Sequence, residues 1–550
     1  MPWAMIKPLF APIALATALA AVAAASSPAL ADTLIHNANG VQVDAQGKLQ
    51  RFSALLIGDD GKVKRLLVKG EVRPRVSARI DAAGKTLLPG LIDAHGHVMS
   101  LGFGALQLDL TGTSSLADLQ QRLKTYAAAS PGNGWIQGRG WNQELWADKR
   151  FPTAADLDAV VSDRPVWLGR VDGHAAVGNS AALRAAGITP ETKSPEGGRI
   201  ESGLFVDAAM TLVESKIPAP TAAAYDAALA KAQELMLANG LTAAADMGTS
   251  PDDWAAMTRA GQAGKLNVRV LGYAGGIPAM RAINGGKPSA WLYRDRLHLG
   301  GVKLYADGAL GSRGAWLKAP YHDMPGTRGL PLITRAELDS QTAEATRGGY
   351  QLAIHAIGDA ANDLVIGAFE KLDGKDRARF RLEHAQVLDI ADLPRLAKTG
   401  IIASMQPTHQ TSDRTMAEAR LGPDRLAGAY AWQTIAKSGA RLAFGSDFPV
   451  ESPNPFPGLA AAVSRQGLDG QPEGGWRPQE RVSFEAALAG FTRGAAYAGF
   501  ADDKIGSLDP GKYADFILVD RDVSTVSPGE LGRTEVLETW VAGKKVWAKK

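Results

Sequence analysis

Short apolar runs alternate with helix-compatible stretches through the middle of the chain. Eight runs have the length of a strand, and they are residues 87–97, 241–247, 269–274, 301–306, 352–355, 380–384, 401–406 and 442–447. Helical periodicity is found between or after them, at residues 221–238 behind the candidate N-cap Thr221, and at 335–348, 361–372 and 483–492. Eight alternating units close most simply into a (β/α)8 barrel, whose active site lies at the C-terminal ends of the strands. The alternative is a doubly wound sheet, but no glycine-rich phosphate loop follows a strand.

Both ends of the chain have a different pattern, with short β-like pieces separated by turn residues. This pattern therefore predicts one small β-sandwich domain built from both termini, residues 32–86 and 499–550. The barrel, over residues 87–498, is inserted between them. The barrel is interrupted by an insertion at about 104–238, far longer than an ordinary loop. Trp and Gly residues cluster there, as at Gly140-Trp141-Asn142. Trp141 is a candidate substrate contact, or else part of the core of the insertion.

The candidate chemistry lies where the apolar runs end. The first run ends in His95-Gly96-His97, and an i, i+2 spacing on a strand puts both imidazoles on one face, as half of a divalent-metal site requires. His355, His384 and Asp447 end the fifth, sixth and eighth runs. Four of the nine histidines thus lie on the rim where a barrel carries its catalytic groups. A single histidine at the end of an apolar strand is more simply explained as a core histidine whose hydrogen bonds are satisfied. Asp447, in the same way, could belong to a turn or cap a helix.

Two further side chains have alternative roles. Lys303 lies within an apolar strand, where a lysine shifts toward the neutral amine that can take up carbon dioxide as a carbamate. From residue chemistry alone, an ion pair between Lys303 and a neighbour such as Asp307 is the simpler expectation. Asp447 suits a hydrolytic metal site, where a carboxylate ligates the ion or takes a proton from the activated water.

Composition narrows the choice of partners. The chain has 60 basic and 57 acidic residues among 550, a formal net charge of +3, and no long block of like charge. This balance indicates no nucleic-acid partner and no electrostatic membrane anchor. Cysteine is absent, so disulfides, a catalytic thiol and thiolate metal ligands are excluded. A metal ion must therefore be bound through nitrogen and oxygen.

The N-terminus has the three-part pattern of a secretory signal peptide over residues 1–31. Lys7 precedes an Ala/Leu-rich run, and Ala29-Leu30-Ala31 forms the small-residue end at which cleavage is expected. A short membrane anchor is the alternative, but the run is short and rich in alanine. The pattern predicts a periplasmic or secreted protein without stable membrane insertion after cleavage.

Several motifs resemble those of the amidohydrolase superfamily. Residues 88–97 resemble its opening signature and residues 506–515 its closing one. The stretches around Val171-Asp172-Gly173-His174, 303–308, 405–409 and 444–447 resemble more narrowly the third amidohydrolase family, which includes N-substituted formamide deformylase. The resemblance covers nearly all of the chain after residue 31.

The resemblance implies a metal-dependent hydrolase with a (β/α)8 barrel and a terminal β-sandwich. It assigns metal ligation to His95, His97, His355, His384 and Asp447, and in the subtypes with two metal ions also to Lys303 as a carboxylated lysine. Asp447 and His384 are the expected catalytic residues, and Asp447 also shuttles the proton. His174, His409 and Arg313 are candidate substrate contacts, although Arg313 equally suits a structural salt bridge.

We therefore expect a zinc-type enzyme, with one or two ions, that cleaves a carbon–nitrogen bond of a small amide, formamide or N-acyl compound. Esters, cyclic amides and phosphotriesters are alternative substrates for the same site. A non-catalytic periplasmic binding protein would lack a ligand or Asp447, and both are present. A homo-oligomer is compatible with the sequence.

Overall fold

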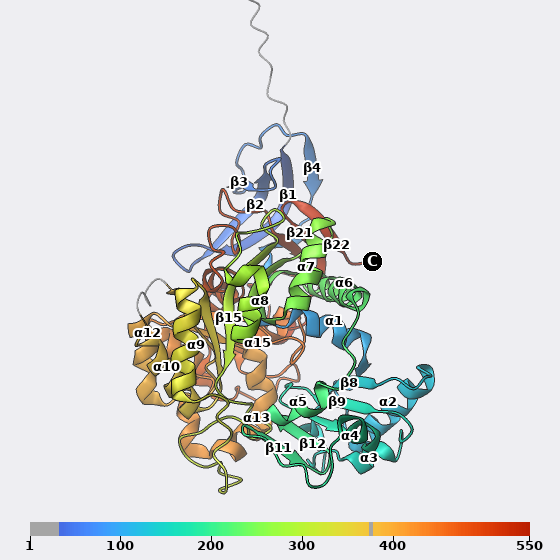
Figure 1. Cartoon of the computed structure of the whole chain (residues 1–550). Coiled ribbons are helices and arrows are strands. Elements are labelled where there is room, and N and C mark those ends of the chain that lie inside the picture. Colours follow the sequence, from blue (N-terminus) through green and yellow to red (C-terminus); the bar gives the residue numbers. More distant parts are fainter. Residues whose placement is uncertain (1–31, 373–377) are drawn as a thin grey trace, which may run out of the picture.

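The structure is a computed structural model that describes residues 32–372 and 378–550. The predicted signal peptide at residues 1–31 lies outside the described residues. Within them, no helix has both the length and the hydropathy needed to cross a lipid bilayer. Figure 1 shows a central barrel, a sheet of both termini at the top, and the insertion at the lower right.

Each of the eight runs predicted as barrel strands contributes one strand to a single parallel sheet. They are β6 (Leu91–Gly96), β13 (Leu241–Thr249), β14 (Arg269–Gly275), β15 (Leu297–Tyr305), β16 (Gln351–Ala356), β17 (Arg381–His384), β18 (Ile402–Met405) and β19 (Arg441–Phe444). Each strand pairs with the next one along the chain, in the order β6 to β19. This confirms the predicted barrel strands.

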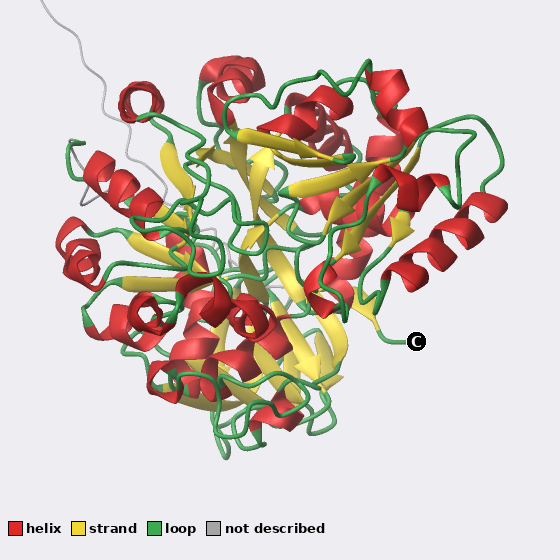
Figure 2. Cartoon of the chain, turned by 90° about the horizontal axis from the view of Figure 1, so that it is seen from below, coloured by secondary structure: helices red, strands yellow, loops and turns green. Residues whose placement is uncertain are grey.

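The helices surround these strands, as Figure 2 shows. They are α1 (Val98–Leu106), α6 (Ala222–Ala238), α7 (Pro251–Gln262), α8 (Gly276–Ala282), α9 (Arg335–Arg347), α10 (Asp359–Phe369), α12 (Leu393–Thr399), α13 (Pro407–Leu421), α14 (Trp432–Lys437), α15 (Pro455–Ser464), α16 (Phe484–Ala489) and α17 (Ala495–Ala498). Thr221 caps α6 as predicted, since its side chain accepts a hydrogen bond from the Ala224 N–H. Residues of β6 and β16 are buried throughout, because helices cover one face and side chains fill the interior.

The barrel is closed between its first and last strands. The Asp447 N–H donates to the His95 carbonyl, and the His97 N–H donates to the Phe448 carbonyl, both at 2.7 Å. The buried Asp93 carboxylate adds a side-chain link, because it accepts hydrogen bonds from the Ser446 N–H and hydroxyl. The strand ends that carry the candidate ligands therefore also close the sheet.

The apolar run at residues 87–97, expected as one strand, is two strands in two sheets. β5 (Thr86–Pro89) pairs with strands of the termini, and β6 begins the barrel. Gly90 lies between them, and a Cβ at this position would be 2.2 Å from the Thr242 hydroxyl oxygen. The chain passes from one sheet to the other where only glycine fits.

The insertion contains a six-stranded sheet with its own core. Its elements are β7 (Leu108–Asp109), α2 (Leu116–Ala129), β8 (Ile136–Trp141), α3 (Ala154–Asp158), β9 (Val166–Arg170), β10 (Ala175–Gly178), α4 (Ser180–Ala186), β11 (Gly198–Glu201), β12 (Leu204–Asp207) and α5 (Thr211–Glu214). Helix α6, which was predicted as the end of the insertion, packs into the barrel core instead.

Strands from both termini join in one further sheet of eight. They are β1 (Thr33–Val43), β2 (Leu49–Ile57), β3 (Val63–Leu67), β4 (Ala78–Asp81), β5, β20 (Phe516–Val519), β21 (Val536–Val541) and β22 (Lys544–Ala548), with α18 (Pro528–Leu531) between β20 and β21. Their division into the two facing sheets of a sandwich stays a prediction.

A buried ion pair joins this sheet to the barrel. The Arg269 guanidinium on β14 donates two hydrogen bonds to Asp515, at 2.6 and 2.9 Å. Both side chains are almost fully buried. Arg269 also lies over the Tyr513 ring, 4.1 Å from its centroid.

We expect Arg269→Ala to destabilise the protein by about 3–5 kcal/mol, because it leaves the Asp515 carboxylate buried without its cation. Thermal unfolding followed by circular dichroism measures the effect. Arg259→Ala is the matched control, since Arg259 forms an ion pair with Asp226 on the surface, and should change stability by about 0–1 kcal/mol. Equal melting temperatures for the two variants would contradict the role given to the buried pair.

Candidate metal centre and its cavity

Three predicted ligands converge at the C-terminal end of β6. His95 is fully buried, and its Nε2 lies 3.5 Å from Asp447 Oδ1. His97 precedes α1, and its Nε2 lies 3.0 Å from the same carboxylate oxygen. One donor atom from each of His95, His97 and Asp447 lies within 4.8 Å of the others. The structure thus brings together the start of the barrel and its last strand.

His355 and His384 lie beside this group on the adjacent strands β16 and β17. Their ring centroids are 4.4 Å apart, and the His384 ring is 4.7 Å from that of His95. His384 Nδ1 lies 2.8 Å from the Gln406 side-chain oxygen, so its Nε2 is the nitrogen left for a ligand. His384, His409 and Asp447 form a second group whose donor atoms lie within 4.8 Å.

Lys303 reaches the same group from β15. Its Nζ lies 3.2 Å from His95 Nε2, and the side chain is buried. Burial lowers the pKa of Lys303 to about 8, although the charges of Glu383 and Asp447 favour its protonated form. The expected alternative, an ion pair with Asp307, is not found among the described residues. Asp307 instead accepts hydrogen bonds from three main-chain N–H groups, those of Trp316, Ile357 and Gly358.

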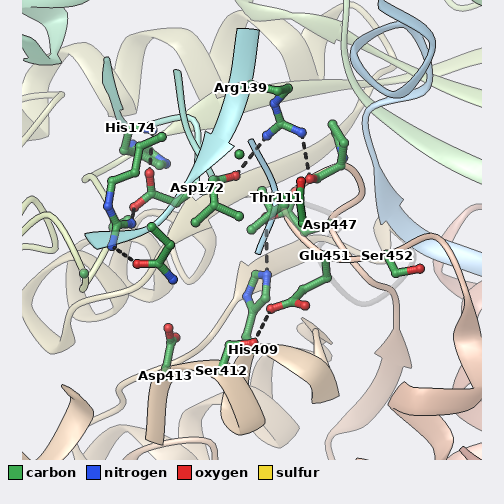
Figure 3. A pocket seen from close by; sticks show the side chains of 18 of the residues that line it. Thr111, Arg139, Asp172, His174, His409, Ser412, Asp413, Asp447, Glu451 and Ser452 are labelled. Atoms are coloured by element: carbon green, nitrogen blue, oxygen red, sulfur yellow. Dashed lines mark hydrogen bonds and ion pairs between the residues drawn. The ribbon is translucent and has the colours of Figure 1, made fainter. Parts of the chain in front are cut away.

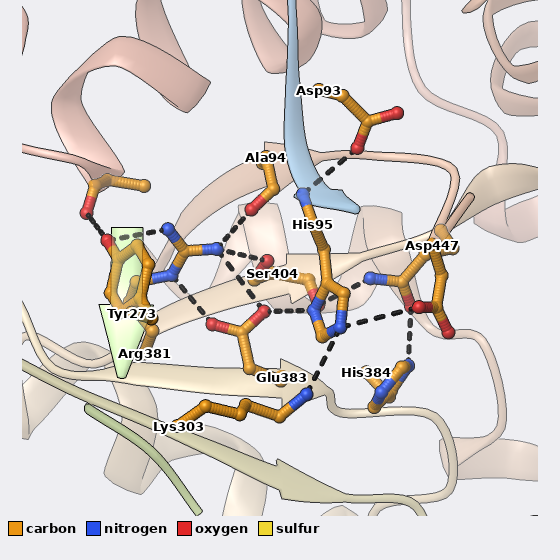
Figure 4. A network of polar contacts seen from close by, with 12 residues as sticks. Asp93, Ala94, His95, Tyr273, Lys303, Arg381, Glu383, His384, Ser404 and Asp447 are labelled. Atoms are coloured by element: carbon orange, nitrogen blue, oxygen red, sulfur yellow. Dashed lines mark hydrogen bonds and ion pairs between the residues drawn. The ribbon is translucent and has the colours of Figure 1, made fainter. Parts of the chain in front are cut away.

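The group that orients His95 was not predicted from the sequence. His95 Nδ1 lies 2.6 Å from Glu383 Oε2, and Glu383 Oε1 accepts a hydrogen bond from the Arg381 Nε, also at 2.6 Å (Figure 4). All three side chains are fully buried. The i, i+2 spacing of Arg381 and Glu383 on one strand was a usable signal, because it puts both on the same face of β17.

The backbone is unusual at two of the predicted ligands. His384 has φ of 72° and Asp447 has φ of 60°, in the left-handed region that residues other than glycine rarely adopt. Such conformations persist where the surrounding structure determines them, often at functional sites. Burial opposes ionisation of Asp447, but the neighbouring imidazoles of His95 and His97 outweigh it and hold its pKa well below the ordinary value.

A cavity of about 760 Å³ opens onto this group. His355 and His384 line it. Asp447, His174 of the insertion and His409 of α13 also line it and are labelled in Figure 3. His174 Nδ1 lies 2.7 Å from Asp207 Oδ1. Burial disfavours the imidazolium, but the hydrogen bond and charge of Asp207 outweigh it and raise the pKa of His174 to about 9. His174 is therefore positively charged at neutral pH.

Two predicted substrate contacts lie elsewhere, and these assignments are corrected. Trp141 is fully buried in the core of the insertion, where its indole N–H donates to the Leu168 carbonyl. Arg313 forms an ion pair with Asp323 at 2.9 Å, which is the structural salt bridge expected as its alternative role. Neither residue lines the main cavity.

The donor set fits a divalent metal ion. Histidine nitrogens and a carboxylate oxygen are ligands that zinc accepts in tetrahedral or larger coordination. Within the described residues, His355 Nε2 is buried and has no hydrogen-bond partner. A buried polar atom without a partner is costly, and a metal ion would supply that partner.

Known proteins resemble this chain over most of its length. Protein LONG AFTER FAR-RED 3 of Arabidopsis thaliana is 35% identical over 497 residues, covering 85% of this chain and 83% of that protein. N-substituted formamide deformylase of Arthrobacter pascens is 28% identical over 550 residues, covering 93% of this chain and 97% of that protein. The crystal structure of an uncharacterized metal-dependent hydrolase from Pyrococcus horikoshii has a TM-score of 0.74 and 29% sequence identity, and the alignment covers 91% of this chain and 99% of that one.

The model of the amidohydrolase family matches residues 78–547, which include the insertion, the barrel and the strands β4, β5, β20 and β21 of the sheet of both termini. This match agrees with the converging donors on the rim of the barrel and with the resemblance of the opening and closing motifs. The chain belongs to the amidohydrolase family, as its sequence motifs predicted.

Proposed function

We propose that this protein hydrolyses a carbon–nitrogen bond in a small amide, formamide or N-acyl compound with a divalent metal ion, zinc being favoured. The observation that carries the proposal is the convergence of His95, His97 and Asp447, the last of which lines a cavity of about 760 Å³. The similarity to N-substituted formamide deformylase along almost the whole chain supports a linear carbon–nitrogen substrate.

The residues that would hold the metal are those gathered on the rim of the barrel, namely His95, His97, His355, His384 and Asp447. When bound, such an ion acts as a Lewis acid and lowers the pKa of a coordinated water to about 7. Lys303 would serve two ions as a bridging carbamate, formed when its neutral amine bonds to carbon dioxide and releases a proton. Its lowered pKa supports this, because a larger share of the amine is neutral.

Asp447 is the proposed proton carrier. It is ionised at neutral pH, so it can accept a proton from the attacking water and pass it to the leaving nitrogen. His174 is charged and lines the cavity, where it can donate a hydrogen bond to the carbonyl oxygen as negative charge develops there. His409 Nε2, 3.8 Å from Asp447 Oδ2, is proposed to contact substrate or to orient Asp447.

Esters, cyclic amides and phosphotriesters remain alternative substrates, because the same water and the same carboxylate would serve them. A panel that compares N-butylformamide and N-butylacetamide with the matching ester, lactam and phosphotriester separates these cases. Export is also part of the proposal, and it is supported by the signal-peptide pattern at residues 1–31.

We expect Asp447→Asn to lower kcat for the best substrate of this panel by about 100- to 10,000-fold, because the amide cannot carry the proton. Metal content is measured by elemental analysis on the same sample, so that loss of catalysis is separated from loss of the ion. Asp424→Asn, which changes an exposed carboxylate, is the control for net charge. A variant that keeps its metal and its full activity would refute the role of Asp447.

The number of metal ions per chain tests whether Lys303 forms a bridging carbamate. Protein purified without chelator and with bicarbonate should carry about two ions per chain, and Lys303→Met at most about one, because the bridging oxygens are lost. Lys371→Met is the control, since Lys371 is exposed and pairs only with Asp339 among the described residues. Two ions in the Lys303→Met variant would exclude a bridging carbamate, and one ion in the unaltered protein would leave Lys303 a role beside a single metal.

A further inference from the structure

Two carboxylates line the cavity away from the barrel strands, and neither is a candidate metal ligand. Asp413 lies on α13, and Glu451 lies in the segment between β19 and α15. Figure 3 shows both beside Ser412 and His409. The Ser412 hydroxyl, next to Asp413 in the chain, donates to Glu451 Oε1 at 2.6 Å. The two acidic groups therefore belong to one wall of the cavity.

Neutral groups hold both carboxylates in place. Asp413 Oδ2 accepts hydrogen bonds from the Gln386 amide at 2.9 Å and from the Tyr430 hydroxyl at 2.6 Å. In the part of the chain that the structure describes, no side chain or main-chain group donates to Asp413 Oδ1 or Glu451 Oε2, and no lysine or arginine forms an ion pair with either residue. Each carboxylate thus keeps one oxygen free.

The arginines of the cavity have other partners. Both terminal nitrogens of Arg139 donate to main-chain carbonyls, those of Pro449 and Val171. Arg170 pairs with Asp172, and Arg414 lies 3.5 Å from the exposed Asp469 carboxylate. None of these guanidinium groups forms an ion pair with either acid of the wall.

Asp413 and Glu451 are half-buried, and two carboxylates that share a wall without an ion-pair partner repel each other. Burial raises the pKa of both carboxyl groups, and the charge of Asp413 raises that of Glu451 further. A second observation indicates that this space receives a ligand. His409, between these acids and Asp447, is nine-tenths buried and has an Nε2 without a hydrogen-bond partner among the described residues.

We propose that Asp413 and Glu451 bind a protonated amine at the end of the substrate remote from the bond that is cleaved. The substrate class is then an amide or formamide of a diamine, with one nitrogen acylated and the other charged. An ammonium group has three N–H donors and a positive charge, which suit the two free carboxylate oxygens. This inference rests on the proposed function, because it specifies the substrate of that same site.

The first test compares N-(ω-aminoalkyl)formamides with three to six methylene groups against N-alkylformamides in which a methyl group replaces the ammonium. We expect kcat/KM to be at least about tenfold higher for the charged compound of the best length. Asp413→Asn and Glu451→Gln should remove this preference, mainly through KM, and should leave the neutral compounds unchanged. Asn and Gln keep an oxygen that can accept the hydrogen bonds of Tyr430 and Ser412, so the wall keeps its shape.

Asp469→Asn is the matched control, because it removes one negative charge beside Arg414 without changing the cavity wall. It should preserve the preference for the charged compound. Equal losses on charged and neutral substrates in Asp413→Asn would overturn the proposal, and so would a preference for N-formyl amino acids, which end in a carboxylate.

The second test does not depend on turnover. Isothermal titration calorimetry of the metal-loaded protein with the free diamines, 1,3-diaminopropane to 1,6-diaminohexane, measures binding of the cation alone. Affinity at least about tenfold weaker in Asp413→Asn and Glu451→Gln than in Asp469→Asn supports the amine site. If this result is found and no formamide is cleaved, the proposed reaction fails but the amine site stands. Equal affinities in all three variants would overturn it even if formamides are cleaved.

Discussion

The candidate metal centre depends on a charge network buried inside the barrel. Glu383 is held by Arg381 at 2.6 Å and can accept a hydrogen bond only from a protonated nitrogen, so Nδ1 of His95 carries the proton. The other nitrogen, Nε2, is then the one that faces Lys303 and Asp447. Breaking a buried pair such as Arg381–Glu383 costs about 3–5 kcal/mol, so the orientation of His95 is strongly fixed.

The hydrogen bonds that close the barrel also place the candidate metal ligands. The main chain of Asp447 bonds to the carbonyl of His95, and Asp93, two residues before His95, binds Ser446 beside Asp447. The left-handed backbone at Asp447 is therefore held from both sides by the first strand. A shift of the last strand would therefore open the sheet and at the same time move Asp447 away from the histidine donors.

The sequence predicted the barrel well, because its strands are buried on both faces and appear as short apolar runs. It also predicted His95, His355 and His384 at strand ends, and the structure brings them together. The division of residues 87–97 at Gly90 was missed, because an apolar run does not reveal which sheet it joins. Trp141 was left with two possible places, the cavity or the core of the insertion, because composition does not tell a buried indole from an exposed one, and the structure places it in that core. The pairing of Glu383 with His95, 288 positions apart, follows from tertiary contacts alone.

The architecture separates the groups that perform chemistry from those that select a substrate. The histidines and Asp447 sit at or just beyond the ends of barrel strands, where hydrogen bonds across the whole sheet hold them. The rest of the cavity comes from the insertion, from α13 and from the segment after β19, which contribute His174, Asp413 and Glu451. Such peripheral segments can change without disturbing the strands. Membership of the family therefore informs the reaction more than the substrate, and the substrate has to be inferred from the charges on the cavity wall.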